Sequence, residues 1–134
     1  MSDYIAYHSV RKMGRPFEPT THFEFYSRKA ESILRRAIGE RAWCIEGTPD
    51  GRSTVYRLVG VFTPSDLRRE HDGYWIVGEG TPFRPPIDVT EASWLPRFMR
   101  RQRNFRLGFS LIRTEGVVPD LERLRNEYDA TSKV

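Results

Sequence analysis

The sequence predicts an α+β protein with a small, strongly bent mixed β-sheet or β-barrel of about five to six strands and flanking helices. Two observations carry this prediction. First, Ala42–Thr63 has two runs rich in β-branched and aromatic residues on either side of Pro-Asp-Gly, the pattern of a hairpin with a longish loop. Second, apolar residues fall on both faces of the second run: Tyr56, Leu58 and Phe62 on one, and Val55, Val59 and Val61 on the other. A strand buried on both faces lies in the centre of a sheet or barrel, and Gly60 marks a bend or bulge in it.

Before the hairpin, alternation predicts a first strand over Tyr4–Val10. A basic loop punctuated by Gly and Pro follows over 11–16, and then a short extended piece within Phe17–Tyr26. Ser27 is a suitable N-cap for a helix over 27–38, which has apolar residues at helical spacing. Gly39 is expected to end this helix in a left-handed conformation.

After the hairpin, residues 64–70 suit a turn or a single helical turn, and Tyr74–Gly78 suits a fourth strand. Thr81–Pro86 contains three prolines and is expected to be irregular. A short helix is predicted over Ser93–Arg101, with Pro96 in its first turn. A fifth strand over Leu107–Ile112 and a terminal helix opened by Pro119 complete the chain.

Length and composition predict one domain over residues 1–134, since 134 residues with 38% hydrophobic content can bury a core. No apolar run approaches the ~20 residues that a membrane span needs, so no membrane partner is expected. The N-terminus lacks the basic region and cleavage site of a signal peptide. One cysteine, Cys44, excludes an internal disulfide, and together these features predict a cytoplasmic protein.

The charge balance permits nucleic acid, DNA or RNA, as a partner. The net charge is +4 and the pI is about 9.5, and nearly all of the 22 basic residues are arginine. Arginine pairs with phosphate through two parallel hydrogen bonds and stacks on bases. A GC-rich genome that replaces lysine with arginine explains the same composition, so this observation leaves both explanations open.

The densest group of candidate binding residues lies in Trp94–Phe109, where arginines alternate with aromatic residues and no acidic residue intervenes. Such a segment can neutralise several phosphates while its rings accept bases. The alternative is a short amphipathic helix with a solvated arginine face. A second basic loop is expected to form the opposite wall of a groove. The predicted nucleic-acid-binding residues are Arg97, Arg100, Arg101, Arg103, Asn104 and Arg106, with Arg11, Lys12 and Arg15 in the second loop.

Three tryptophans, Trp43, Trp75 and Trp94, are candidates for an aromatic cage around a flipped or modified base. Tyr7 and His8, near the end of the first strand, are further candidates. Each tryptophan also suits a core position, because Trp43 alternates in phase with a buried strand pattern and Trp75 sits inside a strand. Trp94 is the favoured cage residue, since it neighbours the arginine segment and lies outside the predicted strands.

The sequence predicts no catalytic residue, no metal site and no cofactor, so we expect a protein that is not an enzyme. His8, His22 and His71 lie in unrelated segments without metal-ligand spacing. Cys44 falls in the middle of a predicted strand and is expected to be inert.

The order of these elements resembles the PUA-like superfamily, which includes the EVE, YTH and ASCH domains. The resemblance is carried by Tyr4–Ser9 as the opening strand, by the hairpin of 42–46 and 55–62, and by Trp94 before the basic segment. It extends to about Ile112. It implies a small bent barrel that binds RNA or DNA, and in EVE and YTH domains an aromatic cage holds a modified base. Only Trp43, Trp75 and Trp94 could correspond to such cage residues, and the resemblance does not assign which of them do.

The sequence therefore favours a non-enzymatic PUA-like module that binds nucleic acid, with recognition of a modified base as the more specific hypothesis. Two alternatives remain open. One is a protein-interaction module or accessory subunit whose basic surface meets an acidic partner. The other is a small toxin-type ribonuclease.

Overall fold

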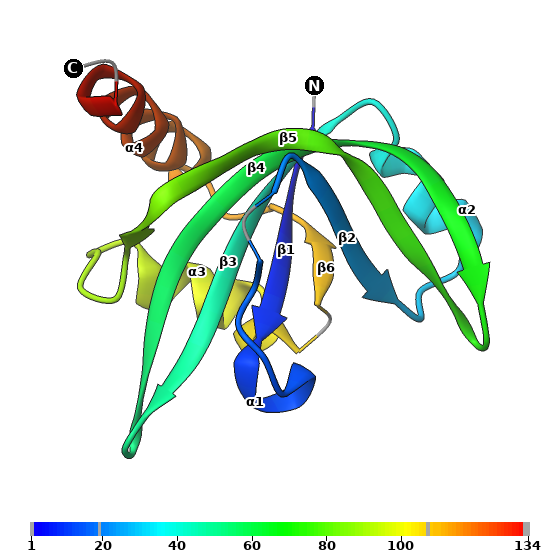
Figure 1. The fold of residues 1–134 in the computed structure, drawn as a ribbon, viewed down its shortest axis with the longest axis horizontal. Helices are drawn as coiled ribbons and strands as arrows, with labels where there is room; N and C mark the ends of the chain where they lie inside the picture. Colours follow the sequence, from blue (N-terminus) through cyan, green and yellow to red (C-terminus); the bar gives the residue numbers. More distant parts are fainter. Residues whose placement is uncertain (1, 19, 107, 133–134) are drawn as a thin grey trace.

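The computed structural model describes residues 2–18, 20–106 and 108–132. They form a six-stranded mixed sheet curled into a half-barrel, with helices around it, which confirms the predicted α+β class (Figure 1). The strands are β1 (Asp3–Ser9), β2 (His22–Ser27), β3 (Arg41–Asp50), β4 (Ser53–Glu70), β5 (Gly73–Asp88) and β6 (Phe109–Leu111). The helices are α1 (Val10–Met13), α2 (Glu31–Leu34), α3 (Leu95–Arg101) and α4 (Val117–Ser132), with the short 3-10 turns η1 (Arg35–Ala37) and η2 (Arg103–Phe105).

The strand order is β2-β5-β4-β3-β1-β6, in which β1 and β3 are parallel and the other neighbouring pairs are antiparallel. The second run of the predicted hairpin, β4, lies inside the sheet as expected. The pairing of β4 with β5 shifts register between Leu58 and Gly60. A Cβ at Gly60 would lie 2.7 Å from the Phe23 ring and 2.8 Å from the Thr81 carbonyl oxygen. The predicted bulge at Gly60 is confirmed, and close packing explains why the residue is glycine.

This bulge corrects the predicted faces of β4. Leu58 and Val61 belong to the core cluster that contains Trp43, whereas Val59 and Phe62 belong to the cluster on the other face. The sequence pattern had placed Phe62 with Leu58 and Val59 with Val61. The extra residue at the bulge shifts the alternation by one position, so Val61 and Phe62 change face.

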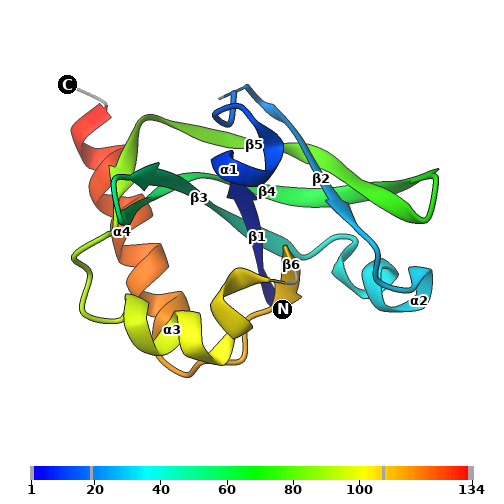
Figure 2. The ribbon, with the colours of Figure 1, turned by 90° about the horizontal axis from the view of Figure 1, so that it is seen from below.

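The sheet has a core on each face. On one face, strand side chains such as Trp43 and Leu58 pack against Phe98 of α3 and Leu121 of α4. These two helices lie together beside the sheet, and α2 lies at the opposite end (Figure 2). On the other face, a second cluster forms where the sheet curls over itself, and it includes Phe23, Phe25, Leu34, Phe62 and Phe109.

Two segments expected to be turns or irregular are strands. Residues 64–70 continue β4 and pair with the start of β5, with Leu67 opposite Ile76. Thr81–Pro86 lies within β5, but the register with β4 jumps from Gly60–Pro82 to Leu58–Ile87, so residues 83–86 keep part of the expected irregularity. Its prolines are tolerated because β2 pairs with β5 only over Tyr74–Glu79, which leaves the later half of β5 at an edge of the sheet.

The predicted helix over 27–38 is much shorter in the structure. Ser27 ends β2, where it pairs with Tyr74, and its Oγ accepts a hydrogen bond from the Lys29 N–H at 3.2 Å. The helix begins only at Glu31, and η1 replaces its last turn. Pairing with β5 outweighs the local capping preference of Ser27. Gly39 follows with a φ of +83°, the left-handed conformation that was predicted.

Smaller differences concern the connections. The hairpin loop is only residues 51–52, because β3 continues to Asp50. The predicted basic loop begins with α1, which Ser9 caps through a hydrogen bond from the Lys12 N–H at 3.3 Å. Pro96 lies in the first turn of α3 as expected. Leu107, in the predicted fifth strand, lies outside the described residues. In the described part of the chain, no helix is long and apolar enough to cross a bilayer.

Candidate functional site

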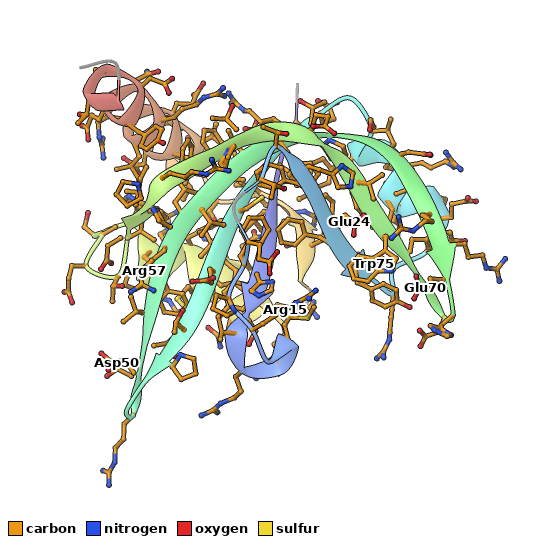
Figure 3. The ribbon with its side chains drawn as sticks, in the orientation of Figure 1. Arg15, Glu24, Asp50, Arg57, Glu70 and Trp75 are labelled. Carbon is orange, nitrogen blue, oxygen red and sulfur yellow. The ribbon has the colours of Figure 1, made fainter. Side chains whose placement is uncertain are left out.

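A groove of about 660 Å³ is bounded by β1 and α1, by the end of β2, and by the segment around η2. Trp75 of β5 also lines it. Trp75 and Glu24 are seen on the arm of the curled sheet that contains β2, whereas Asp50 and Arg57 lie on the opposite arm (Figure 3). The lining residues are Tyr7, His8, Ser9, Lys12, Met13, Glu24, Phe25, Tyr26, Ser27, Arg28, Lys29, Trp75, Asn104, Phe105, Arg106 and Gly108.

Aromatic rings supply much of the groove surface. Tyr7 stacks on Phe105 with centroids 4.9 Å apart, and Tyr26 meets Trp75 edge-on at 5.3 Å. Trp75 is partly exposed, and its Nε1 donates a hydrogen bond to Glu70 Oε2 at 2.9 Å, which fixes the orientation of the indole. The Arg68 guanidinium lies 6.0 Å from the centroid of its ring. Rigid, partly exposed rings of this kind accept the flat face of a nucleic-acid base.

Tyr7 is held in place from β3. A Cβ at Gly47 would overlap the Tyr7 hydroxyl, so glycine leaves the room that the phenol occupies. Burial, together with the nearby Tyr56 and Glu46, raises the pKa of Tyr7 to about 12. The phenol is therefore neutral at physiological pH.

His8 has a structural contact in the groove wall. Its Nε2 donates to the Arg15 carbonyl oxygen at 2.8 Å, because a carbonyl can only accept. The ring also meets Phe17 edge-on at 5.8 Å. His8 thus ties the loop after α1 to β1.

Several cations of the groove have no internal partner. Within the described residues, Lys12, Lys29 and Arg106 form no ion pair through their side chains. Arg28 differs, because it pairs with Asp72 at 3.1 Å. The groove therefore offers positive charge beside its aromatic surface, which suits a phosphate backbone.

A second hollow, of about 370 Å³, lies on the other side of η2 and shares Lys29 with the groove. Its lining contains five cations and no aspartate or glutamate: Lys29, Arg36, Arg101, Arg103 and Arg113. In the part of the chain that the structure describes, none of the five forms an ion pair. Burial and the nearby Arg113 and Arg103 lower the pKa of Lys29.

The turn η2 separates the groove from the hollow. Arg103, Asn104 and Phe105 have φ values of +52°, +54° and +61°, a left-handed conformation that costs non-glycine residues about 1–3 kcal/mol each. Phe105 is buried and anchors the turn, while the preceding Gln102 donates from Nε2 to Ser110 Oγ at 2.7 Å. Arg103 lines the hollow and Asn104 the groove. Such strain is typical of functional segments.

The structure thus divides the predicted basic residues into three groups. Lys12, Asn104 and Arg106 line the groove, so α1 and the arginine segment both contribute to its lining. Arg101 and Arg103 line the hollow. The remaining four lie outside both and are exposed: Arg11, Arg15, Arg97 and Arg100.

The three tryptophans are not brought together. Trp43 is fully buried, donates from Nε1 to Asp3 Oδ2 at 2.7 Å and lies under the Arg41 guanidinium, so it is a core residue. Trp94 is half-buried against Phe98 and lines a separate hollow that also contains Asp88 and Glu91. Of the cage candidates, only Trp75, Tyr7 and His8 line one groove.

Sequence reasoning missed the contributions of Lys29, Arg36 and Arg113 to the hollow, and of Tyr26 to the groove. In the sequence, Lys29 and Arg36 read as the polar face of a helix. Nothing local indicates that Arg113, more than 70 residues away, lies beside them. The sequence indicated Phe105 only weakly as a residue of the groove, through its alternation with the arginines.

Signals of catalysis remain few. Cys44 is buried, and burial raises the pKa of its thiol well above the ordinary value. Among the described residues, no group of three His, Cys, Asp or Glu could hold a metal ion. One surface cluster joins His22 to Glu79 at 3.2 Å and to Glu24 at 3.1 Å, and Arg68 lies 3.4 Å from Glu24.

Comparison with known proteins adds no family to this description: a scan against protein-family models, a search of curated proteins and a search of solved structures each found no match.

Proposed function

We propose that this chain is a non-enzymatic nucleic-acid-binding module of the PUA-like type, and that its groove holds a base of DNA or RNA. The observation that carries the proposal is the shared lining of one groove by Trp75, Tyr7, Lys12 and Arg106, which come from four separate segments. The curled half-barrel with flanking helices is compatible with a PUA-like fold.

Each part of the groove has a matching part in a nucleotide. Trp75 and Tyr7 present partly exposed rings to a base, and stacking is worth about 1–3 kcal/mol per base. Asn104 offers an amide, which pairs in two hydrogen bonds with a base edge. Lys12 and Arg106 can meet the flanking phosphates without first breaking an internal ion pair. A modified base is the more specific ligand that we propose for this surface.

The proposal is tested by fluorescence anisotropy with labelled single- and double-stranded DNA and RNA, each with and without methylated bases. We expect binding in at least one series, a preference for one modified base, and loss of both in Trp75→Ala. Trp94→Ala is the matched control, because Trp94 is also half-exposed but lines a different hollow. Failure of every oligonucleotide to bind would contradict the proposal and favour an accessory subunit with an acidic partner.

A second candidate, the toxin-type ribonuclease, has one observation in its favour. His22, Glu24, Glu79 and Arg68 form a His/Glu/Arg cluster, the set of groups that acid–base cleavage of RNA uses. Both ring nitrogens of His22 are already bonded to carboxylates, which leaves neither free for a substrate. Incubation of labelled RNA with the parent and with Glu24→Gln distinguishes the two functions, since cleavage lost in this variant would support the ribonuclease.

A further inference from the structure

The charged side chains that line the second hollow are all cationic. Its five cations come from the loop before α2, from η1, from α3 with η2, and from the segment after β6. No carboxylate lines it, whereas arginines elsewhere, such as Arg28, Arg41 and Arg123, pair with acidic residues. Five like charges around one hollow attract an anion, because no carboxylate in the lining offsets their field.

We infer that this hollow binds the terminal phosphomonoester of the nucleic-acid strand whose base lies in the groove. The inference rests on the function proposed above and adds a strand end as the ligand. A phosphomonoester carries about −1.5 to −2 charges at neutral pH and has three acceptor oxygens, as phosphorylated side chains do. An internal phosphodiester carries only one negative charge, so it offsets less of the charge of the five cations than a monoester does.

The donors in the hollow suit this group. Arg101, Arg103 and Arg113 each present a planar guanidinium, which binds phosphate through two parallel hydrogen bonds. Ser110 also lines the hollow, and its Oγ accepts from Gln102 Nε2 at 2.7 Å, which leaves the hydroxyl hydrogen to donate. Ile33, 46% exposed, covers one side with apolar surface and reduces the competing water.

The lowered pKa of Lys29 reports the same crowding of charge. Burial and the neighbouring Arg113 and Arg103 disfavour its ammonium form. A dianion bound between these groups reverses the electrostatic part of this effect, so we expect ligand binding to raise the pKa of Lys29.

The hollow and the groove are placed for one nucleotide. Lys29 lines both, and Arg103 and Asn104, adjacent in the strained turn, line the hollow and the groove respectively. A phosphate held by Arg103 and a base contacted by Asn104 are therefore separated by the thickness of the turn. This placement joins a terminal phosphate to its own base and explains why the turn keeps a costly conformation.

The test compares oligonucleotides of one sequence that carry a phosphate at one end, at the other end, or at neither. We expect one phosphorylated form to bind the parent about tenfold or more tightly than the unphosphorylated form, the factor for one net charge-assisted hydrogen bond. The double variant Arg103→Gln/Arg113→Gln should abolish this difference. The control Arg97→Gln/Arg100→Gln removes the same charge from exposed arginines outside the hollow and should keep it.

The outcomes separate this inference from the proposed function. Equal binding of all three forms, with affinity still dependent on Trp75, would overturn the terminal-phosphate site and leave the base-binding groove in place. A phosphate preference that survives in Arg103→Gln/Arg113→Gln would also overturn it. Absence of binding to every form would contradict the proposed function itself. Thermal melts of both double variants confirm folding, which we expect because these arginine side chains are exposed.

Discussion

The Tyr7 ring lies against Phe105 with their centroids 4.9 Å apart and their planes at 25°, so the first strand supports the left-handed turn that divides the groove from the hollow. Phe105 also meets Phe98 of α3 edge-on at 5.5 Å. The turn η2 therefore holds its conformation through packing beneath it. The polar residues that it presents, Arg103 and Asn104, depend on this one buried ring.

Phe105→Ala should destabilise the protein by about 3–5 kcal/mol, because it removes a buried ring and leaves a cavity under the turn. Denaturant-induced unfolding measures this loss. Asn104→Gly, in the same turn but exposed, is the control and should change the free energy of unfolding little, because glycine adopts the φ of +54° without strain. A loss below about 1 kcal/mol in Phe105→Ala would mean that packing does not hold the turn.

Gly39→Val should cost about 1 kcal/mol or more in the free energy of unfolding. Gly39 has a φ of +83°, and no atom lies within 4 Å of the position that a Cβ would occupy, so the cost isolates backbone strain. Gly39→Asn is the matched control, because asparagine tolerates left-handed conformations, and it should be milder. Thermal melts with equal loss in both variants would contradict this origin.

The sequence contained enough information for the centre of the fold. β-branched and aromatic residues define the pairing of β3 with β4, and Gly60 correctly marks the bulge because a side chain there has no room. The same bulge reversed the predicted faces beyond it. The strand over 64–70 was missed because its stabilising partner, the start of β5, is a tertiary contact that local propensity does not reveal.

The site was predictable only in part. The alternation of arginine with aromatic residues pointed to the segment around Asn104 and Arg106, and three of the five cage candidates, Tyr7, His8 and Trp75, line one groove. The hollow was not predictable, because Lys29 and Arg113 are distant in sequence and meet only through the curl of the sheet. Trp94, near the arginines in sequence, faces another hollow.

The pKa of His22 should lie above its ordinary value of 6.5, because its ring is hydrogen-bonded to Glu24 and Glu79, which favour the imidazolium. A raised folded-state pKa means that this stabilisation is present below pH 6.5 and is lost as the pH rises through the folded-state pKa. NMR titration of the His22 ring protons measures this pKa. Glu24→Gln should lower the pKa of His22, whereas the control Glu91→Gln, in the loop before α3, should leave it unchanged. A His22 pKa at or below 6.5 in the parent protein would contradict the hydrogen bonds to Glu24 and Glu79.

Replacing Arg101, Arg103 and Arg106 with glutamine should weaken binding to all nucleic-acid sequences similarly. It should also flatten the dependence of log K on log salt by about 0.9 per lost contact for duplex, or about 0.7 for single strands. The triple variant of Arg11, Arg97 and Arg100 removes equal charge from positions outside the groove and the hollow. If log K depended on log salt with the same slope in the two triple variants, Arg101, Arg103 and Arg106 would not contact phosphates.

Trp75→Ala should melt close to the parent temperature yet lose about 1–3 kcal/mol of binding free energy for each base stacked on the indole. Its ring is partly exposed and lies at the surface between Tyr26, Glu70 and the Arg68 guanidinium, so truncation leaves no enclosed cavity. Trp43→Ala should behave in the opposite way and unfold the protein, because Trp43 is fully buried and its loss costs about 3–5 kcal/mol.

Trp94→Ala should retain affinity, since Trp94 lines a hollow away from Tyr7 and the groove cations. Thermal melts and anisotropy titrations on the three variants separate stability from binding. If Trp94→Ala lost the preference for a modified base while Trp75→Ala kept it, the base would bind beside α3, and the groove would lose its proposed role.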